Sequence, residues 1–276
     1  MEKLGIQDIG VICALGQNKA DVAQHLFANQ ASPGVVDEHG WIPEQSVYVA
    51  KSSPNLSALP AHLSHFDCRN NRLLKHAADE INHSLTELTQ HYARDRIAVI
   101  IGSSTSGILE GEQALAFQQQ QGEMPENFHY RQQEIGTSAL FLKQYLALDG
   151  LAFTISTACS SSAKVFASAQ RLIESGLCDA AIVGGADSLC RLTINGFSAL
   201  ESVSSNLCNP MAAERDGITI GEGAALFILS HQNTDIQLLA TGESSDAHHI
   251  SAPQPDGLGA EAAMRAALKQ ANITEQ

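Results

Sequence analysis

The sequence predicts an α/β fold, in which short buried strands alternate with longer helices. Two features lead to this prediction. Short apolar runs end at glycine or at a small polar residue, as do strands that are buried on both faces. The segments between those runs repeat apolar residues at the three- and four-residue spacing that is typical of helices packed on a sheet.

The N-terminal part is expected to contain two helices separated by a loop. The first helix is predicted over residues 18–29, where Asn18 supplies a side-chain oxygen as the N-cap. Residues 30–68 are rich in serine, proline and histidine, and their weak periodicity predicts a surface loop. A helix is then predicted from Arg69 to Gln90, because apolar residues recur along one face.

The rest of the chain is expected to alternate between strands and helices. The apolar runs that predict strands are residues 96–102, 151–156, 179–187, 223–229 and 235–242. Residues 103–150 are expected to form a turn rich in glycine and serine, followed by mostly helical, polar sequence. Two further segments, 160–175 and 260–271, have the periodicity of amphipathic helices.

The composition predicts a globular protein and excludes two classes of function. Hydrophobic residues make up 44% of the 276 residues and charged residues 17%, which is enough apolar sequence for a sizeable core. The net charge of −14 argues against binding to nucleic acid or to an anionic membrane. The first residues lack the apolar core of a signal peptide, and no apolar run approaches the roughly 20 residues of a membrane span. The six cysteines show no paired spacing, so we expect reduced thiols in a cytoplasmic chain.

Cys159 lies where the strand 151–156 is expected to turn into the helix 160–175. The unpaired N–H groups and the positive dipole end of a helix start stabilise a thiolate, which is the reactive form of cysteine. The small residues around it, Ala158 and the serines at 160–162, permit a sharp turn and close approach of a substrate. By position alone Cys159 is more often a small buried side chain than a nucleophile, and both interpretations stay open at this point.

A series of short motifs surrounds Cys159 in a fixed order. They are "DIGVICALGQN", "IGSSTSG", "TACSSSA" with Cys159 itself, "GLCDAAIVGGAD", "NGF", "ERDGITIGEGAALFIL" and "SSDAHHISAPQPDG". In this order and spacing they resemble the β-ketoacyl-[acyl carrier protein] synthases, the condensing enzymes of fatty-acid and polyketide synthesis. The resemblance implies a thiolase-like, layered αβαβα fold, with a complete first half over residues 1–230 and a truncated second half over 235–276.

The resemblance also implies a role for three residues of the site. Cys159 would be the nucleophile that accepts an acyl chain from an acyl carrier protein, for decarboxylative condensation with malonyl-carrier, and its backbone N–H would form half of an oxyanion hole. Thr105 falls where the family has a pocket-lining residue that limits the length of the acyl chain. Met211 replaces an aromatic residue that borders the same pocket. No cofactor and no metal are expected.

The partners that the resemblance implies are an acyl carrier protein and a second subunit. The carrier would dock on basic residues at the start of the predicted helix, where Arg69, Arg72 and Lys75 fall at neighbouring helical positions. A solvated basic helix face is the other interpretation of these residues. The second subunit would be an identical chain, or a complete ketosynthase in a heterodimer, paired through the strand 151–156.

The motifs leave other functions open. The family uses two histidines, one in an "HGT" motif, together with a lysine and a glycine–phenylalanine loop, and this sequence contains no "HGT". His248 and His249 match a segment upstream of those histidines and are expected to be structural or on the surface. The chain would then be a fragment of a longer enzyme, a short subunit whose core is covered by a partner, or a variant with an altered C-terminal region. A non-elongating partner subunit similar to a chain-length factor is the main alternative, and a thioesterase or acyltransferase that uses Cys159 alone is a weaker one.

Three further patterns are interpreted as structural. His62, His65 and Cys68 are three residues apart, but zinc usually requires a fourth ligand and a tighter motif, so a surface loop is expected. The "VGGAD" turn at 183–187 lacks the G-x-G-x-x-G pattern of nucleotide sites. Glu222 in "GEG" is expected to be a buried, hydrogen-bonded carboxylate rather than a general acid.

Overall fold

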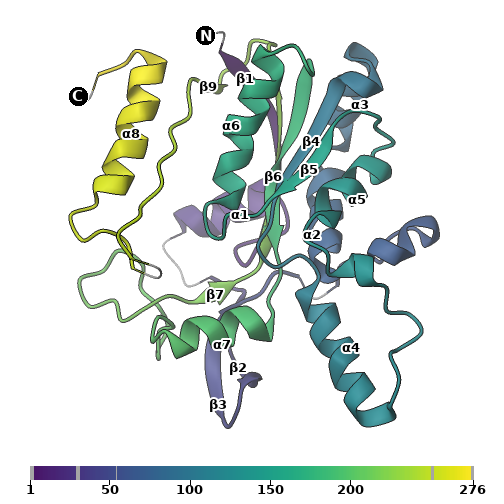
Figure 1. Cartoon of the computed structure of the whole chain (residues 1–276), viewed down its shortest axis with the longest axis vertical. Coiled ribbons are helices and arrows are strands. Elements are labelled where there is room, and N and C mark those ends of the chain that lie inside the picture. The colour runs from purple at the N-terminus through teal and green to yellow at the C-terminus, as the bar shows by residue number, and fades with distance from the viewer. Residues whose placement is uncertain (1–2, 29–31, 54, 250–251, 275–276) are drawn as a thin grey trace.

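A six-stranded mixed sheet forms the centre of the computed structural model, which describes residues 3–28, 32–53, 55–249 and 252–274 (Figure 1). Its strand order is β5–β4–β6–β8–β1–β9. The strands are β1 (Leu4–Cys13), β4 (Ile97–Gly102), β5 (Ala152–Ile155), β6 (Ala180–Asp187), β8 (Gly223–Ser230) and β9 (Gln237–Leu238). β4 pairs in parallel with β5 and β6, whereas β8 runs antiparallel to both β6 and β1.

Four of the predicted strands are confirmed as β4, β5, β6 and β8. All residues of β4 and all but the last of β6 are buried, which explains why their sequences are continuously apolar. The fifth predicted strand, 235–242, shrinks to β9, which pairs only with the first two residues of β1. β9 thus belongs to the same six-stranded sheet as β1. The division of the chain into a first half over 1–230 and a second half over 235–276 stays a prediction.

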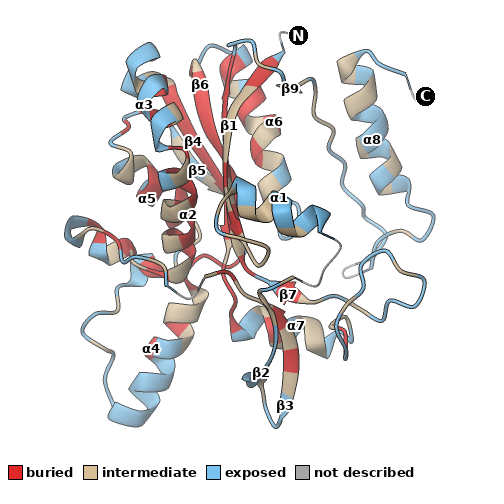
Figure 2. Cartoon of the chain, turned by 180° about the vertical axis from the view of Figure 1, so that it is seen from behind, coloured by how far each residue is buried: buried red, intermediate tan, exposed pale blue. Residues whose placement is uncertain are grey.

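Helices cover both faces of the sheet (Figures 1 and 2). α2 (Arg69–Glu80) and α5 (Thr137–Tyr145) pack on one face, and α6 (Ser161–Glu174) packs on the other, over β4, β5 and β6. Buried side chains concentrate on the central strands and on α2, while α8 (Leu258–Ala271) has no buried residue (Figure 2). The α–β–α sandwich accounts for three of the five expected layers.

The helix predicted from Arg69 to Gln90 is interrupted at Ile81, which has φ −103° and ψ 20°. The interruption divides the segment into α2 and α3 (Asn82–His91). The apolar face that predicted the helix is nevertheless confirmed, since all six of its side chains are buried. They are Leu74, Ala77, Ala78, Ile81, Leu85 and Leu88.

The surface loop predicted over residues 30–68 is wrong in its larger part. β2 (Val35–Ile42) and β3 (Gln45–Ala50) form an antiparallel hairpin, and β3 pairs in parallel with β7 (Ile220–Gly221). The buried side chains of β3 are Val47 and Val49, which pack near α7 (Arg191–Ala199), a helix that was not predicted. The apolar side chains that the hairpin contributes are few, Val47 and Val49 with Trp41 and Ile42 of β2, so the segment as a whole shows little apolar periodicity. A short 3-10 helix, η1 (Ala61–Phe66), follows it.

The helices predicted over 18–29, 160–175 and 260–271 are confirmed as α1 (Lys19–Phe27), α6 and α8, each within two residues of the predicted ends. α1 starts after Asn18, whose side-chain oxygen accepts the N–H of Asp21 at 2.9 Å, as predicted. α4 (Ile108–Gln121) ends in the glutamine tract, and Gly122 stops it with φ 86°. Parts of the predicted segments 18–29, 30–68 and 235–276 lie outside the described residues.

Two helices obtain their N-terminal caps from α4 rather than from their own sequence. The N-cap residues of α2 and α7 are cysteines that make no side-chain cap. Glu110 instead accepts the first N–H of α2, from Arg69, at 2.7 Å. Glu112 accepts the first two N–H groups of α7, from Arg191 and Leu192, at 2.9 and 2.8 Å. The carboxylates satisfy N–H groups that would otherwise lack partners and complement the positive ends of both helix dipoles.

Candidate active site

Cys159 lies in the sharp turn between β5 and α6, as the sequence predicted. Of the six cysteines, all of which fall in the described part of the chain, it alone is exposed. The interpretation of Cys159 as a small buried side chain is therefore wrong. Residue 158 just before it has φ 52°, in the left-handed region that an alanine rarely adopts.

Hydrogen bonds hold this strained turn in place. The carbonyl of Ala158 accepts both the N–H of Ser161, at 3.1 Å, and its hydroxyl, at 2.6 Å. The same hydroxyl oxygen accepts the N–H of Thr157 at 2.8 Å. Backbone strain persists only where the surroundings fix it, and it is concentrated at functional sites. The turn presents Cys159 to solvent immediately before the first turn of α6.

Two glycines let α6 approach the sheet closely. A Cβ on Gly102 would lie 2.5 Å from the carbonyl carbon of Ser161 and 2.5 Å from the nitrogen of Ser162. A Cβ on Gly185 would lie 2.0 Å from the hydroxyl oxygen of Ser162. The first turn of α6 therefore rests directly on the carboxyl ends of β4 and β6, the edge at which open α/β sheets bind ligands.

Thr105 lies in the loop 103–107 that follows β4. The loop starts beside β5, the strand that precedes Cys159, because the N–H of Ser103 donates to the carbonyl of Ile155 at 3.2 Å. Thr105 is buried, and its hydroxyl donates to Asp187 Oδ1 at 2.9 Å and accepts the N–H of Ser188 at 3.0 Å. The structure thus places Thr105 and Cys159 after adjacent parallel strands. Asp187 was not predicted as part of the site, although its motif "GGAD" ends the strand β6 at this edge.

Met211, unlike the buried Thr105, lies on the surface. It lies in the segment between α7 and β7, its residue is 94% exposed, and its φ is 66°. In the described chain it faces solvent rather than an enclosed pocket. Its place beside an acyl pocket stays a prediction.

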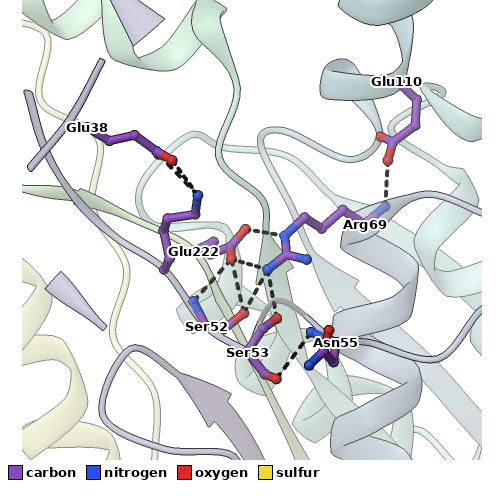
Figure 3. Close-up of polar contacts among 8 residues, drawn as sticks. Glu38, Ser52, Ser53, Asn55, Arg69, Glu110 and Glu222 are labelled. Atoms are coloured by element: carbon purple, nitrogen blue, oxygen red, sulfur yellow. Dashed lines mark hydrogen bonds and ion pairs between the residues drawn. The ribbon is translucent and has the colours of Figure 1, made fainter. Parts of the chain in front are cut away.

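Arg69 is held inside the chain by Glu222 (Figure 3). Its Nε donates to Glu222 Oε2 at 2.7 Å and its Nη2 donates to Oε1 at 2.5 Å, while Ser52 donates to the same carboxylate through its N–H and its hydroxyl. Burial alone would raise the pKa of Glu222, but Arg69 and then Ser52 more than offset this, so the pKa lies below its usual range. The prediction of a buried structural carboxylate at Glu222 is confirmed.

Arg72 and Lys75 also have partners within the chain. Asp67 binds Arg72 through two hydrogen bonds, at 2.7 and 2.8 Å, and the Arg72 side chain is 37% exposed. Lys75 donates to Asp79 at 2.7 Å and lies 5.5 Å from the ring centre of Tyr145, with only 15% of its side chain exposed. A docking partner would have to compete with these carboxylates for the three cations. Carrier binding on α2 stays a prediction, and Arg72 has the most exposed side chain of the three.

An apolar cavity of about 320 Å³ lies beside the first turn of α6, on the face of the sheet formed by β1, β6 and β8. Its lining includes Ile12, Ser162, Gly185, Asp187 and Phe227. The glycines of β6 and β8 were visible in the sequence, but only the pairing of distant strands brings them together. Through Ser162 and Asp187 the cavity adjoins the first turn of α6 and the residue that binds Thr105.

The histidines do not form a second site in the described chain. His248 and His249 are exposed, and the N–H of His248 donates to Asp246 at 2.9 Å. His65 packs against the rings of Phe66 and His129, at centroid distances of 4.0 and 5.8 Å. Within the described ranges, no group of three histidine, cysteine or acidic side chains is arranged to hold a metal ion. Nor does any described helix have the length and apolar character needed to cross a membrane.

Comparison with known proteins identifies related sequences. The family model described as "Beta-ketoacyl synthase, N-terminal domain" matches residues 1–234. The 3-oxoacyl-[acyl-carrier-protein] synthase 2 of Rhizobium meliloti (strain 1021) is 35% identical over 143 residues, which cover 46% of this chain and 34% of that protein. A putative mitochondrial 3-oxoacyl-[acyl-carrier-protein] synthase of Schizosaccharomyces pombe is 33% identical over 156 residues, or 51% of this chain and 37% of that protein. The matched regions thus span little more than a third of these relatives.

Solved structures share the fold. A chain from the complex of the ketosynthase ApeO with its chain length factor ApeC, from Xenorhabdus doucetiae, superposes with a TM-score of 0.94 at 46% identity. The match covers 99% of this chain and 69% of that one. The ishigamide ketosynthase/chain length factor superposes with a TM-score of 0.84 at 22% identity, over 99% of this chain and 70% of that one, which shows similarity of fold alone.

Proposed function

Because the chain belongs to the β-ketoacyl synthase family, we propose that it accepts an acyl group on Cys159 for condensation with a malonyl group carried by an acyl carrier protein. The observation that carries the proposal is the exposed Cys159 on a strained turn at the start of α6. No other cysteine combines exposure with a helix start among the described residues. The matched region covers about a third of the 3-oxoacyl-[acyl-carrier-protein] synthases, so the condensing activity of those whole enzymes is proposed for this chain.

The proposed first step is a transfer between thioesters. The Cys159 thiolate attacks the carbonyl carbon of an acyl-carrier thioester, the bond from that carbon to the carrier sulfur breaks, and the carrier leaves as its thiolate, so that a covalent acyl-enzyme remains. The Cys159 N–H is one donor to the oxyanion that develops on the carbonyl oxygen. In the second step the malonyl thioester loses carbon dioxide, and the resulting carbanion attacks the acyl carbon and releases Cys159.

Thr105 is proposed to limit the acyl chain, as the family position implies. Its hydroxyl is already bonded to Asp187 and Ser188. It would therefore present its methyl group to an acyl chain. Carrier docking on Arg69, Arg72 and Lys75 is proposed with Arg72 as the principal contact, because the other two side chains are less exposed.

The proposed nucleophile can be tested on the purified chain. We expect iodoacetamide to label Cys159, and an acyl-loaded carrier protein to leave an acyl adduct on the same residue, both detected by intact mass and peptide mapping. The Cys159→Ala variant should lose both products, whereas Cys208→Ala, which removes a partly buried thiol, should keep them. Acylation of Cys159→Ala at the wild-type rate would contradict the proposal.

The second candidate function is that of a partner subunit similar to a chain-length factor. It is favoured by the similarity to a chain of a complex that contains a ketosynthase and its chain length factor. In that role Cys159 would be dispensable. Full activity of a co-purified complete ketosynthase with the Cys159→Ala variant would decide for this second function.

Pairing through β5 is the proposed mode of assembly. β5 is the edge strand of the sheet, and Leu151 and Phe153 are exposed by 45% and 37%. An exposed edge with apolar side chains is suited to pair with the same strand of a second copy or of a related subunit. We expect the wild type to sediment as a dimer and Phe153→Lys to sediment as a monomer. Phe27→Lys, which changes an exposed phenylalanine on α1, should remain a dimer, and a monomeric wild type at micromolar concentration would contradict this mode of pairing.

A further inference from the structure

The loop 103–107 is strained and depends on its anchors. Ser106 is fully buried and has φ 45°, in the left-handed region that serine seldom adopts. At its N-terminal side the loop is bound to Asp187 Oδ1, which accepts the N–H groups of Ser104 and Thr105 at 2.8 and 2.9 Å. The hydroxyl of Ser106 donates to the carbonyl of Glu134 at 3.0 Å.

The other end of the loop continues directly into α4, which is weakly packed. Of its fourteen residues, all described, only Gly111 and Ala114 are buried. Cavities of about 350 and 580 Å³ flank the helix, and Leu109 and Gln113 line both of them. Apolar contacts therefore fix α4 poorly, and polar contacts in its first turn determine where it begins.

Glu110 makes the contact that ties this first turn to α2. Its Oε1 accepts the N–H of Arg69 at 2.7 Å, and its Oε2 is buried without a hydrogen-bond partner among the described residues (Figure 3). Burial raises the pKa of this carboxyl, and the Arg69 N–H offsets that only in part. Such a group is retained at a cost in stability, which indicates a positional role.

Arg69 is itself held in place by contacts with the sheet. Its guanidinium is held by Glu222 at the start of β8, and the next residue, Gly223, pairs with Asp187 in the sheet. Both ends of the loop are thus anchored to the same corner of the sheet. Asp187 holds one end directly, and Glu110 holds the other through Arg69.

We infer that Glu110 is a positioning residue, which fixes the loop 103–107 and thereby sets the length of the acyl chain that Cys159 accepts. The inference on chain length rests on the proposed function, since Thr105 borders the acyl chain only if Cys159 is acylated. The role of Glu110 in fixing the loop follows from its hydrogen bond to the Arg69 N–H and from the ion pair of Arg69 with Glu222. Glu110→Ala removes the acceptor for the Arg69 N–H, whereas Glu110→Gln keeps an oxygen in its place.

Two measurements test this inference. The first is hydrogen–deuterium exchange at the amides of the loop 103–107, which we expect to accelerate in Glu110→Ala and to return to the wild-type rate in Glu110→Gln. The second is acylation of Cys159 by short, medium and long straight-chain N-acetylcysteamine thioesters. Glu110→Ala should raise the ratio of long-chain to short-chain acylation by roughly fivefold, the scale of one lost helix cap, and leave the iodoacetamide rate unchanged.

Glu80→Ala is the matched control, because Glu80 accepts the first N–H of α1, from Lys19, at 2.7 Å on a different part of the fold. It should change neither the exchange of the loop nor the acylation ratio. Unchanged loop exchange in Glu110→Ala would overturn the positional role, as would equal changes in Glu80→Ala. Faster exchange of the loop with an unchanged ratio of long-chain to short-chain acylation would overturn the link to chain length. If Glu110→Ala does not fold, Glu110→Asp takes its place, because its shorter side chain withdraws the acceptor from the Arg69 N–H. A wild type that is not acylated at all would instead refute the proposed function, while the exchange measurement still decides the positional role.

Discussion

Replacing Glu222 by alanine is expected to lower the free energy of unfolding by about 3 kcal/mol or more, because it leaves a largely buried guanidinium without its carboxylate. The side chain of Glu222 is 1% exposed and that of Arg69 is 21% exposed. Among the described residues, the Arg69 guanidinium would keep only its hydrogen bonds to Ser52 and to the carbonyl of Ser53. Urea titration followed by circular dichroism measures the effect.

The control for this prediction is an ion pair on the surface. Glu261 and Arg265 lie one turn apart on α8, with 47% and 60% of their side chains exposed. Such pairs contribute about 0.5 kcal/mol or less, so Glu261→Ala should scarcely move the urea midpoint. If Glu222→Ala were as mild as Glu261→Ala, the buried pair would not be a principal anchor of the fold.

The pH dependence of the same pair has a defined sign. The pKa of Glu222 is lowered in the fold, from an ordinary value of 4.5, so its ionisation stabilises the folded chain at higher pH. That contribution is lost as the pH falls from 4.5 through the folded-state pKa. The stability difference between the wild type and Glu222→Gln is therefore expected to be constant near neutral pH and to shrink on acidification. A difference that did not vary with pH would contradict a role for the carboxylate charge.

Replacing Gly102 by alanine is expected to move α6 and impair Cys159. The new Cβ would lie 2.5 Å from backbone atoms of Ser161 and Ser162, and backbone cannot yield as a flexible side chain does. Overpacking of this kind costs about 1–3 kcal/mol, and the first turn of α6 must shift to relieve it. We expect a lower urea midpoint together with an iodoacetamide rate at Cys159 that falls by up to roughly a hundredfold, the effect of a misplacement on the order of 1 Å.

Gly196→Ala is the matched substitution, because a Cβ on Gly196 would meet no described atom within 4 Å. Gly196 lies inside α7, where alanine is favoured over glycine by about 0.5–1 kcal/mol. This variant should be at least as stable as the wild type, with unchanged labelling of Cys159. A Gly102→Ala chain with wild-type stability and reactivity would show that α6 does not depend on this close approach.

The features predicted correctly from the sequence are those with a local signal. β4 and β6 are buried on both faces, so their own residues are continuously apolar. The motifs around Cys159 predicted both the family and the mixed α/β fold, which the matching family model and the superposition on a chain from a ketosynthase–chain length factor complex confirm. The turn at Cys159 was also predicted, because the small residues between the strand and the helix permit a sharp turn.

The features that were missed depend on residues far apart in the sequence. β1 pairs with β8, which lies at the other end of the matched region, and its polar Gln7 and Asp8 interrupt any simple pattern. Arg69 was interpreted from its neighbouring helical positions with Arg72 and Lys75, which gave no sign of a partner within the chain. That partner, Glu222, is separated from it by 153 positions. A local pattern shows that a cation lies at a helix start, but not which carboxylate the fold brings to it.

The open edge of β5 also bears on how the chain behaves when it is produced alone. The four residues of this strand include no proline and no charged side chain, the devices with which proteins protect sheet edges. As long as this edge is unpaired, an extended segment of a partly unfolded copy can therefore add to the sheet there. Co-expression with the pairing subunit, or a lysine placed in β5, would suppress aggregation during purification and storage.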